Sequence, residues 1–395
     1  MKIRAWARLL LAAAPLLAGC GNFWQAPTGG SGSGSGGCTS NCSTATSGNF
    51  YILNSGSTPQ VAGFSIVSGA LTAISGSPWT VESEPYAMAM APNGNFLIVS
   101  TLSGVYAYPI SGGKLGTATV VSQDQAYAVQ VDDTNSWLIE AIPGTTGVIV
   151  GAVPINSTTG ADNGSEITAQ FAVAGAALQK NGMVISQDNA NIFIALGTGG
   201  TIVVPFNAAN PLPKNISAIT IAVLNPPGAA LSVAVDPGTT PRLFYIGETL
   251  AGNSGTSGGL RAIVYSSLGS NPLIQATGSP IASGGLAPSF ILPVTTPDYV
   301  YVANGEGLSA GNINGFAITA ASGPSYSIAT GSTAAVGVSP LGMAEDSTGA
   351  FLLEVGSSGS PYFDSFTFDA TTTGKLDTQI TSTAAVESIA IVAAP

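Results

Sequence analysis

The sequence predicts an all-β fold, a seven-bladed β-propeller closed by its own C-terminal strand, and three observations support this. A strand–turn–strand unit recurs at intervals of 41 to 58 residues, which suits four-stranded blades with loops of variable length. The last unit, residues 387–395, stops after its first strand, and residues 50–54 resemble the missing second strand. No helical periodicity of useful length follows residue 19. The centres of the first strands are Met88, Val129, Val184, Val233, Ile291, Met343 and Ile391.

A closed ring explains why the last unit is cut short. In an open stack, residues 388–394 and residues 50–54 would each lack a neighbouring strand and would expose unpaired backbone groups. In a ring, the last strand completes the first blade. We therefore expect residues 388–394 to pair beside residues 50–54.

Residues 1–19 read as a lipoprotein signal peptide. Lys2, Arg4 and Arg8 form a positive start, and a short apolar run follows that is too short to span a bilayer. The run ends in the lipobox Leu17-Ala-Gly-Cys20, so we expect Cys20 to become the lipidated N-terminal residue. Gly21, rather than an aspartate, follows the cysteine, which favours the outer membrane of a two-membrane bacterium.

Residues 20–48 form the predicted tether between the lipid and the folded domain, residues 49–395. The repeat of glycine and serine from Gly29 to Gly37 cannot bury enough apolar surface to order itself. Cys38 and Cys42 follow in an exported and therefore oxidising setting, where a small-loop disulfide or two free thiols are the open alternatives. Two cysteines in a chain without histidine make a poor zinc site, so we expect no metal and no cofactor.

The strands of each unit follow in order from residue 50. The hairpin turns after the first strands are rich in Asp, Asn and Gly, which tolerate left-handed backbone or bond to their own main chain. Most second strands are apolar at every position, as expected when neighbouring blades cover both sheet faces. The predicted second strands are residues 96–100, 137–141, 192–196, 243–247, 299–303 and 351–355.

The charge balance excludes one class of partner. The chain has nine basic and twenty acidic residues; without the three basic residues of the signal, six remain and the net charge is −14. Such a surface repels nucleic acid and anionic headgroups, so membrane contact through the lipid anchor alone is expected. We expect a monomer whose partner is a small molecule or an envelope protein.

Several segments resemble a known family. Residues 299–304, 50–54 and 96–101 look like the YVTN-type repeat. The Gly-x-Leu openings of fourth strands and the Gly-Ser-Pro segments at 76–78 and 278–280 look like those of bacterial lactonase-family propellers. The resemblance covers residues 50–395 and implies the fold. The best-known activity of that family is 6-phosphogluconolactone hydrolysis, but these motifs are structural and imply little about activity.

The sequence offers few catalytic groups. Without histidine there is no Ser-His or Cys-His nucleophile system. Glu140 and Glu354 stand out because they occupy the same fourth position of otherwise apolar second strands. A carboxylate between packed blades is costly unless it is paired or hydrated. Either both line one polar pocket near the ligand-binding face, as weak catalytic candidates, or each reaches backbone amides or water in a gap between blades.

Other polar residues lie where the strands end. Asn54, Asn304 and Glu306 are expected where second strands run into loops, the rim that propellers use for ligands. An asparagine at a strand end can equally cap a turn. The acidic doublets at 132–133 and 345–346 are expected to be solvated hairpin residues.

These observations favour a lipid-anchored binding or interaction module at the cell envelope. The second hypothesis is a lactone-ring hydrolase that uses carboxylate-assisted attack by water. Convergence of Glu140 or Glu354 with a cation at one mouth of the channel would favour the hydrolase. Their separation would favour the binding module.

Overall fold

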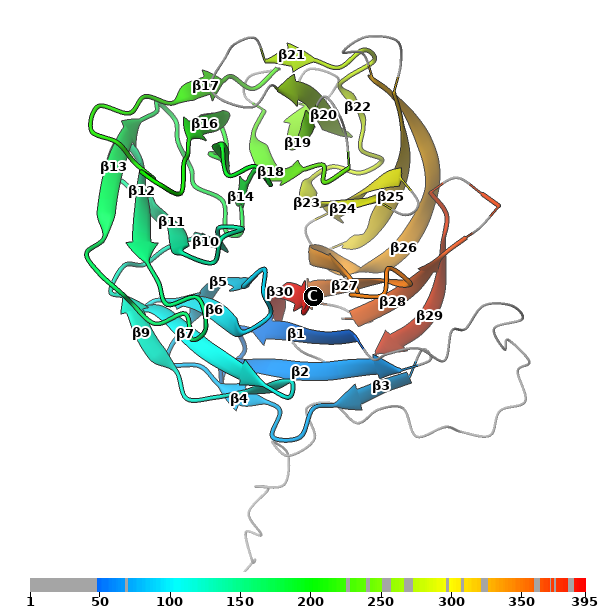
Figure 1. Ribbon diagram of the computed structural model, residues 1–395. Coiled ribbons are helices and arrows are strands. Elements are labelled where there is room, and N and C mark those ends of the chain that lie inside the picture. The colour runs from blue at the N-terminus through cyan, green and yellow to red at the C-terminus, as the bar shows by residue number, and fades with distance from the viewer. Residues whose placement is uncertain are drawn as a thin grey trace, which may run out of the picture.

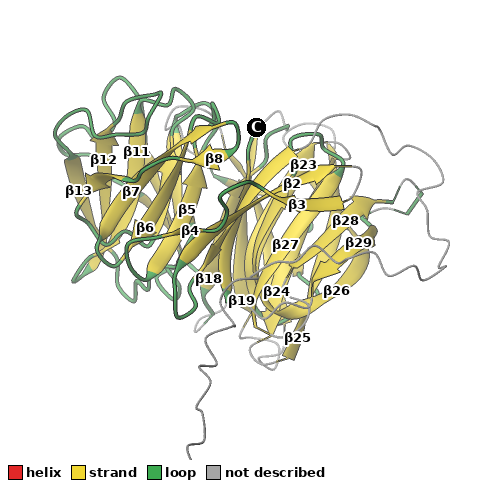
Figure 2. Ribbon diagram, turned by 90° about the horizontal axis from the view of Figure 1, so that it is seen from below, coloured by secondary structure: helices red, strands yellow, loops and turns green. Residues whose placement is uncertain are grey.

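The computed structural model describes residues 48–67, 70–224, 228–238, 242–250, 257–265, 273–295, 298–306, 309–320, 326–358, 363–369, 371–372, 374–382 and 387–395. These residues form a ring of seven β-sheet blades around a central axis (Figure 1), which confirms the predicted fold. Turned by 90°, the ring shows strands with loops at their ends and no helix (Figure 2). Among the described residues, no helix could cross a membrane. The signal peptide, Cys20, Cys38 and Cys42 lie outside the described residues.

Five blades are separate sheets. The first contains β3 (Ala70–Ala73), β2 (Gln60–Val67), β1 (Gly48–Asn54) and β30 (Ser388–Ala393), with β4 (Trp79–Thr80) on β2. The second contains β5 (Pro85–Met90), β6 (Phe96–Thr101), β7 (Gly104–Ser111), β8 (Lys114–Leu115) and β9 (Thr119–Ser122). The third contains β10 (Ala128–Val131), β11 (Trp137–Pro143), β12 (Gly147–Pro154) and β13 (Ile167–Ala172). The fourth contains β14 (Met183–Ile185), β15 (Asn191–Ala195), β16 (Thr201–Pro205) and β17 (Ile219–Ile221). The fifth contains β18 (Ala230–Val235), β19 (Arg242–Leu250), β20 (Ser257–Tyr265), β21 (Ile274–Gln275) and β22 (Ile281–Ala282).

The sixth and seventh blades share one long strand, which the sequence did not predict. Their strands are β23 (Pro288–Thr295), β24 (Asp298–Glu306), β25 (Ser309–Ala320), β26 (Tyr326–Glu345), β27 (Phe351–Ser358), β28 (Phe363–Phe368) and β29 (Leu376–Ser382). The first part of β26 is the outer strand of the sixth blade on β25, and its last part is the inner strand of the seventh on β27. Register shifts in both pairings let one strand bend from the rim to the axis.

The predicted closure of the ring is confirmed. β30 pairs antiparallel with β1, with Ile391 opposite Ile52 and Ala393 opposite Phe50. Ser388 Oγ donates a hydrogen bond of 2.9 Å to Asn54 Oδ1 at one end of the pair. The two chain ends therefore complete the first blade, and the C-terminus lies beside the axis (Figure 1).

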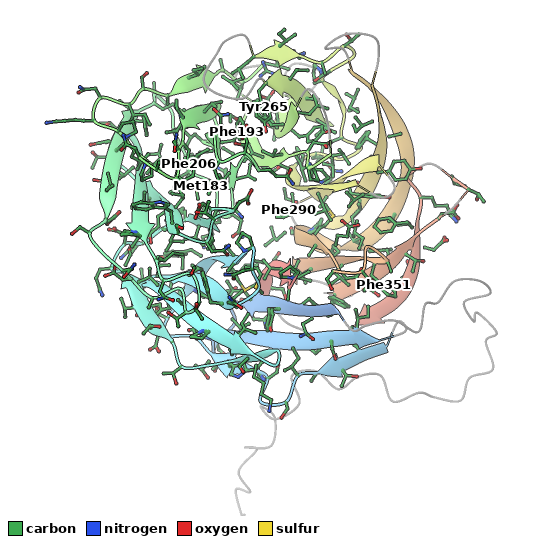
Figure 3. The ribbon with its side chains drawn as sticks, viewed as in Figure 1. Met183, Phe193, Phe206, Tyr265, Phe290 and Phe351 are labelled. Atoms are coloured by element: carbon green, nitrogen blue, oxygen red, sulfur yellow. The ribbon has the colours of Figure 1, made fainter. Side chains whose placement is uncertain are left out.

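Side chains from neighbouring blades form the core. All six residues of β6 are buried, as expected for a second strand covered on both faces. Phe193 stacks on Phe244 between the fourth and fifth blades, with ring centroids 4.3 Å apart. The Tyr265 ring meets Phe193 in a T-shaped arrangement with centroids 5.3 Å apart, and Figure 3 labels both residues. Phe50 stacks on Phe363 at 5.5 Å between the first and seventh blades. Each blade is therefore stabilised mainly by its neighbours around the ring.

One residue of each acidic doublet differs from the expectation, whereas Asp133 is exposed as expected. Asp132 and Asp346 are buried rather than solvated. Asp132 Oδ1 accepts hydrogen bonds from the backbone N–H groups of Ser136 and Trp137, at 2.8 and 2.7 Å. Asp346 Oδ1 accepts the same pair of backbone hydrogen bonds in the seventh blade. The first strand turns into the second around these carboxylates, because they satisfy donors that would otherwise be unpaired in the turn.

Candidate functional site: a carboxylate cluster and a channel mouth

The structure does not bring Glu140 and Glu354 together. Both side chains are fully buried. Glu140 lies on β11 of the third blade and contacts Ser122 at the end of β9 in the second blade. Glu354 lies on β27 and shares a strand face with Leu352, which packs against Tyr301 of the sixth blade. The two carboxyl groups therefore occupy separate gaps, one between the second and third blades and the other between the sixth and seventh.

Two further carboxylates meet Glu140 in its gap. One carboxylate oxygen from each of Asp124, Glu140 and Glu166 lies within 4.8 Å of the others. Asp124 belongs to the loop after β9, and its backbone N–H donates to Ser122 Oγ at 3.0 Å. Glu166 directly precedes β13. We call these three residues the carboxylate cluster.

A glycine makes room for the cluster. Gly151 on β12 lies opposite Glu140 on one side and Thr168 of β13 on the other. A Cβ atom at Gly151 would lie 2.3 Å from Glu166 Oε1. Because position 151 has no side chain, Glu166 can reach over β12 toward Glu140.

Burial and mutual repulsion set the protonation of the cluster. Burial raises the pKa of Glu140 to about 8; the Ser122 hydrogen bond opposes this shift, and the nearby charges of Glu166 and Asp124 add to it. Burial, followed by the charge of Asp124, raises the pKa of Glu166 to about 7. Oε1 of each glutamate is buried without a hydrogen-bond partner. No lysine or arginine forms an ion pair with the cluster within the described parts of the chain.

Glu354 is buried beside a second acid. It lies opposite Asp364 of β28, and neither of its own carboxyl oxygens has a hydrogen-bond partner. Burial and the charge of Asp364 raise the pKa of Glu354 well above the usual range, which favours its protonated form.

Glu248, which the sequence reasoning missed, is stabilised differently. Its buried carboxylate on β19 forms an ion pair of 3.1 Å with Arg261 Nη1 on β20. Arg261 also donates to the Ala222 carbonyl and to Gln275 Oε1, both at 3.0 Å. One basic residue is thus held in an ion pair between two strands of the fifth blade. The signal in the sequence is weak, because Glu248 and Arg261 are diagonal neighbours only in the β19–β20 pairing, where Gly259 lies opposite Glu248 and Arg261 lies opposite Ile246.

The predicted rim residues have structural partners. Asn304 Oδ1 accepts from Ser283 Oγ at 2.7 Å, and its Nδ2 donates to the Ser283 carbonyl and to Asn312 Oδ1, both at 2.9 Å. Asn54 accepts from Ser388, while its Nδ2 has no partner. The side chain of Glu306 lies outside the described residues. Asn304 thus joins β24 to the loop before β23, and only Asn54 keeps an unused donor.

A second polar group lies at the end of the blades where the first strands begin and the second strands end; we call it the channel-mouth group. Tyr86 on β5 and Tyr127, just before β10, have ring centroids 5.0 Å apart. Lys180 Nζ lies 4.6 Å from the centre of the Tyr86 ring, and Asn181 Nδ2 donates to the Ile389 carbonyl at 3.2 Å. These residues come from three consecutive blades and from the closing strand, whose inner strands surround the axis (Figure 1). The repeat could have revealed the two tyrosines, since each lies two residues before the centre of a first strand.

A cavity of about 240 Å³ lies at the opposite end of the first strands, beside the hairpin turns. Its walls come from the ends of β5, β26 and β30 and are mainly apolar. Glu345 lines it, and burial followed by the charge of Asp346 raises the pKa of Glu345 to about 6.

Comparison with known proteins identifies the architecture. No family model and no curated protein matches the sequence. A periplasmic gluconolactonase from Pseudomonas aeruginosa has a similar structure, with a TM-score of 0.64, 14% identity and coverage of 89% of this chain and 99% of that one. A protein from Lactobacillus plantarum has a TM-score of 0.64 and 15% identity, covering 88% and 99%. A functionally unknown protein from Desulfotomaculum acetoxidans has a TM-score of 0.59 and 11% identity, covering 86% and 99%. At such identities the likeness shows a shared fold alone.

Proposed function

We propose that this chain is an exported propeller, anchored to the cell envelope by lipid on Cys20, that binds a small polar molecule at the Tyr86–Tyr127–Lys180 mouth. The observation that carries the proposal is the meeting of two phenols and an ammonium group from three consecutive blades, at the end where their first strands begin. Tyrosine offers an apolar ring face with a hydroxyl that donates and accepts, and lysine attracts an anionic group. A polar ring or chain bearing a carboxylate matches this set.

The separation of Glu140 and Glu354 supports binding over hydrolysis. A carboxylate-assisted hydrolase needs its acid, its base and its substrate-holding cations around one bound lactone. Glu354 has no hydrogen-bond partner on either carboxyl oxygen, and the described residues show no ion pair between a lysine or arginine and either glutamate.

Lactone hydrolysis is the second candidate, and one observation favours it. Glu140 and Glu166 have raised pKa values of about 8 and about 7, so near neutral pH one can donate and the other accept a proton. The structural neighbour from Pseudomonas is named a gluconolactonase, and hydrolysis of a gluconolactone yields a sugar acid. The same sugar acid is therefore a suitable probe for both hypotheses.

We expect the protein to bind gluconate without accelerating gluconolactone opening. Because Lys180 would pair with the carboxylate, Lys180→Ala should weaken binding by about tenfold, measured by ligand-observed NMR. The exposed Lys214 is a matched control, and Lys214→Ala should bind as the wild type does. Lactone opening between about pH 5 and 8 should equal that of a heat-denatured sample.

Two results would contradict the binding-module proposal. Robust lactone turnover that Glu140→Gln abolishes would establish the hydrolase and place its chemistry in the carboxylate cluster. Gluconate binding that is equal in wild type, Lys180→Ala and Tyr86→Ala would remove the channel mouth as the site.

The anchor has its own test. We expect labelled palmitate to enter the wild-type protein and not Cys20→Ser, because the lipobox cysteine supplies the acceptor thiol. Two or more acyl chains hold a protein stably at a membrane, so the wild type should fractionate with the outer membrane and the variant should not. Equal labelling of both proteins would contradict lipidation at Cys20.

A further inference from the structure

The burial of the Glu140 carboxyl group is only partly compensated by hydrogen bonds within the protein. Its side chain has no exposed surface, and only Oε2 has a partner, the Ser122 hydroxyl at 3.0 Å. Its Oε1 belongs to the buried atoms without a hydrogen bond. A buried carboxylate with an unpaired oxygen costs several kcal/mol unless something neutralises or coordinates it.

The surroundings increase this cost. Asp124 and Glu166 add two more carboxylates within 4.8 Å, and Glu166 Oε1 is also buried without a partner. The contrast with Glu248 is direct, because that buried carboxylate has the Arg261 guanidinium at 3.1 Å. Within the described residues the cluster has no such cation. Unless protons hold it neutral, its charge is balanced by an ion from solution.

We propose that Asp124, Glu140 and Glu166 bind a hard divalent cation of the Ca²⁺ class between the second and third blades. This inference does not rest on the proposed ligand at the channel mouth. The site offers carboxylate oxygens, with the Ser122 hydroxyl beside them, and Ca²⁺ prefers oxygen ligands from carboxylates and water. Oxygens about 2.4 Å from one Ca²⁺ ion lie at most about 5 Å apart, which matches the spacing of the cluster. Asp124 and Glu166 are partly exposed, so water can complete the coordination.

Such an ion would join segments that no strand pairing connects. Asp124 belongs to the loop leaving the second blade, Glu140 to β11 and Glu166 to the segment entering β13. A bound cation would therefore link the second blade to the inner and outer parts of the third. Protons compete for the same carboxylate oxygens, so affinity should fall as the pH is lowered.

The test is titration of the purified, EDTA-treated protein with CaCl2, followed by calorimetry and by thermal unfolding at about pH 8. We expect Ca²⁺ at a hundredfold excess over Kd to raise Tm by about 4 °C in the wild type. Glu140→Gln should weaken Ca²⁺ binding at least tenfold, because it removes a ligand charge. Glu82→Gln, which neutralises an exposed carboxylate outside the cluster, should leave binding unchanged.

Gly151→Ala provides a variant that keeps every charge. Its Cβ atom would displace only the flexible end of Glu166, so circular dichroism should stay native while Ca²⁺ binding weakens at least tenfold. Ca²⁺ binding that is equal in wild type, Glu140→Gln and Gly151→Ala would overturn the proposal. So would a wild type that responds to none of Ca²⁺, Mg²⁺ and Mn²⁺, or one that responds to Zn²⁺ alone.

Discussion

Removal of residues 387–395 is expected to lower the Tm by about 10 °C or more, or to yield aggregated protein. The deletion removes β30, and with it the antiparallel partner of β1 and the buried side chains of Ala390 and Ile391. Ile391 packs with Phe50 and Phe363, so the contact between the first and seventh blades is also lost. Thermal unfolding followed by circular dichroism, with light scattering in parallel, measures both outcomes.

The C-terminal proline supplies a matched control. Pro395 lies beyond the pairing of β30 with β1, so its deletion alone should shift Tm by no more than about 1 °C. A synthetic peptide with the sequence of residues 387–395 should bind the shortened protein and recover part of the lost stability, because it can pair with the open edge of β1. A shortened chain that melts like the full chain would contradict the role of this closure.

The architecture could be predicted because each blade repeats the same local sequence pattern. A first strand, a turn built on Asp, Asn or Gly, and an apolar second strand recur in the sequence, and the incomplete last unit indicates closure. The continuous β26 could not be predicted in this way. Gly331, Gly337 and Pro340 lie within it, and such residues ordinarily end or weaken a strand. Tertiary pairing on both sides overrides that local preference.

The site was less predictable for a physical reason. Glu140 is conspicuous in the sequence because a carboxylate interrupts an apolar strand. Its partners are not conspicuous, because Asp124 and Glu166 lie in polar loops where acidic residues are ordinary. They converge only because β11, β12 and β13 are neighbours and Gly151 leaves space between them. Glu354, equivalent in the repeat, has Asp364 opposite it and belongs to no group of three carboxylates among the described residues.

The largest effect of a single substitution is expected for Glu140→Gln in metal-free protein at alkaline pH. The pKa of Glu140 is about 8 in the folded protein, against an ordinary value of 4.5. Because folding raises this pKa, the protonated carboxyl contributes to the free energy of unfolding. This contribution is fully present below about pH 4.5 and is lost as the pH rises through about 8. Glu166 acts in the same direction up to about pH 7. The metal-free wild type should therefore be less stable at about pH 8.5 than at about pH 5.5.

Glutamine removes this dependence at one position while keeping the shape and an acceptor for the Ser122 hydroxyl. In EDTA at about pH 8.5, Glu140→Gln should raise the free energy of unfolding by about 3 kcal/mol, with little change at about pH 5. Urea unfolding at the two pH values, with Glu82→Gln as the exposed control, measures the difference. Parallel pH profiles for wild type and Glu140→Gln would show that Glu140 is not protonated in the folded state. The gain in the free energy of unfolding caused by Glu140→Gln should shrink or reverse when CaCl2 replaces EDTA. A bound cation stabilises the ionised Glu140 carboxylate of the wild type, and glutamine cannot supply such a carboxylate.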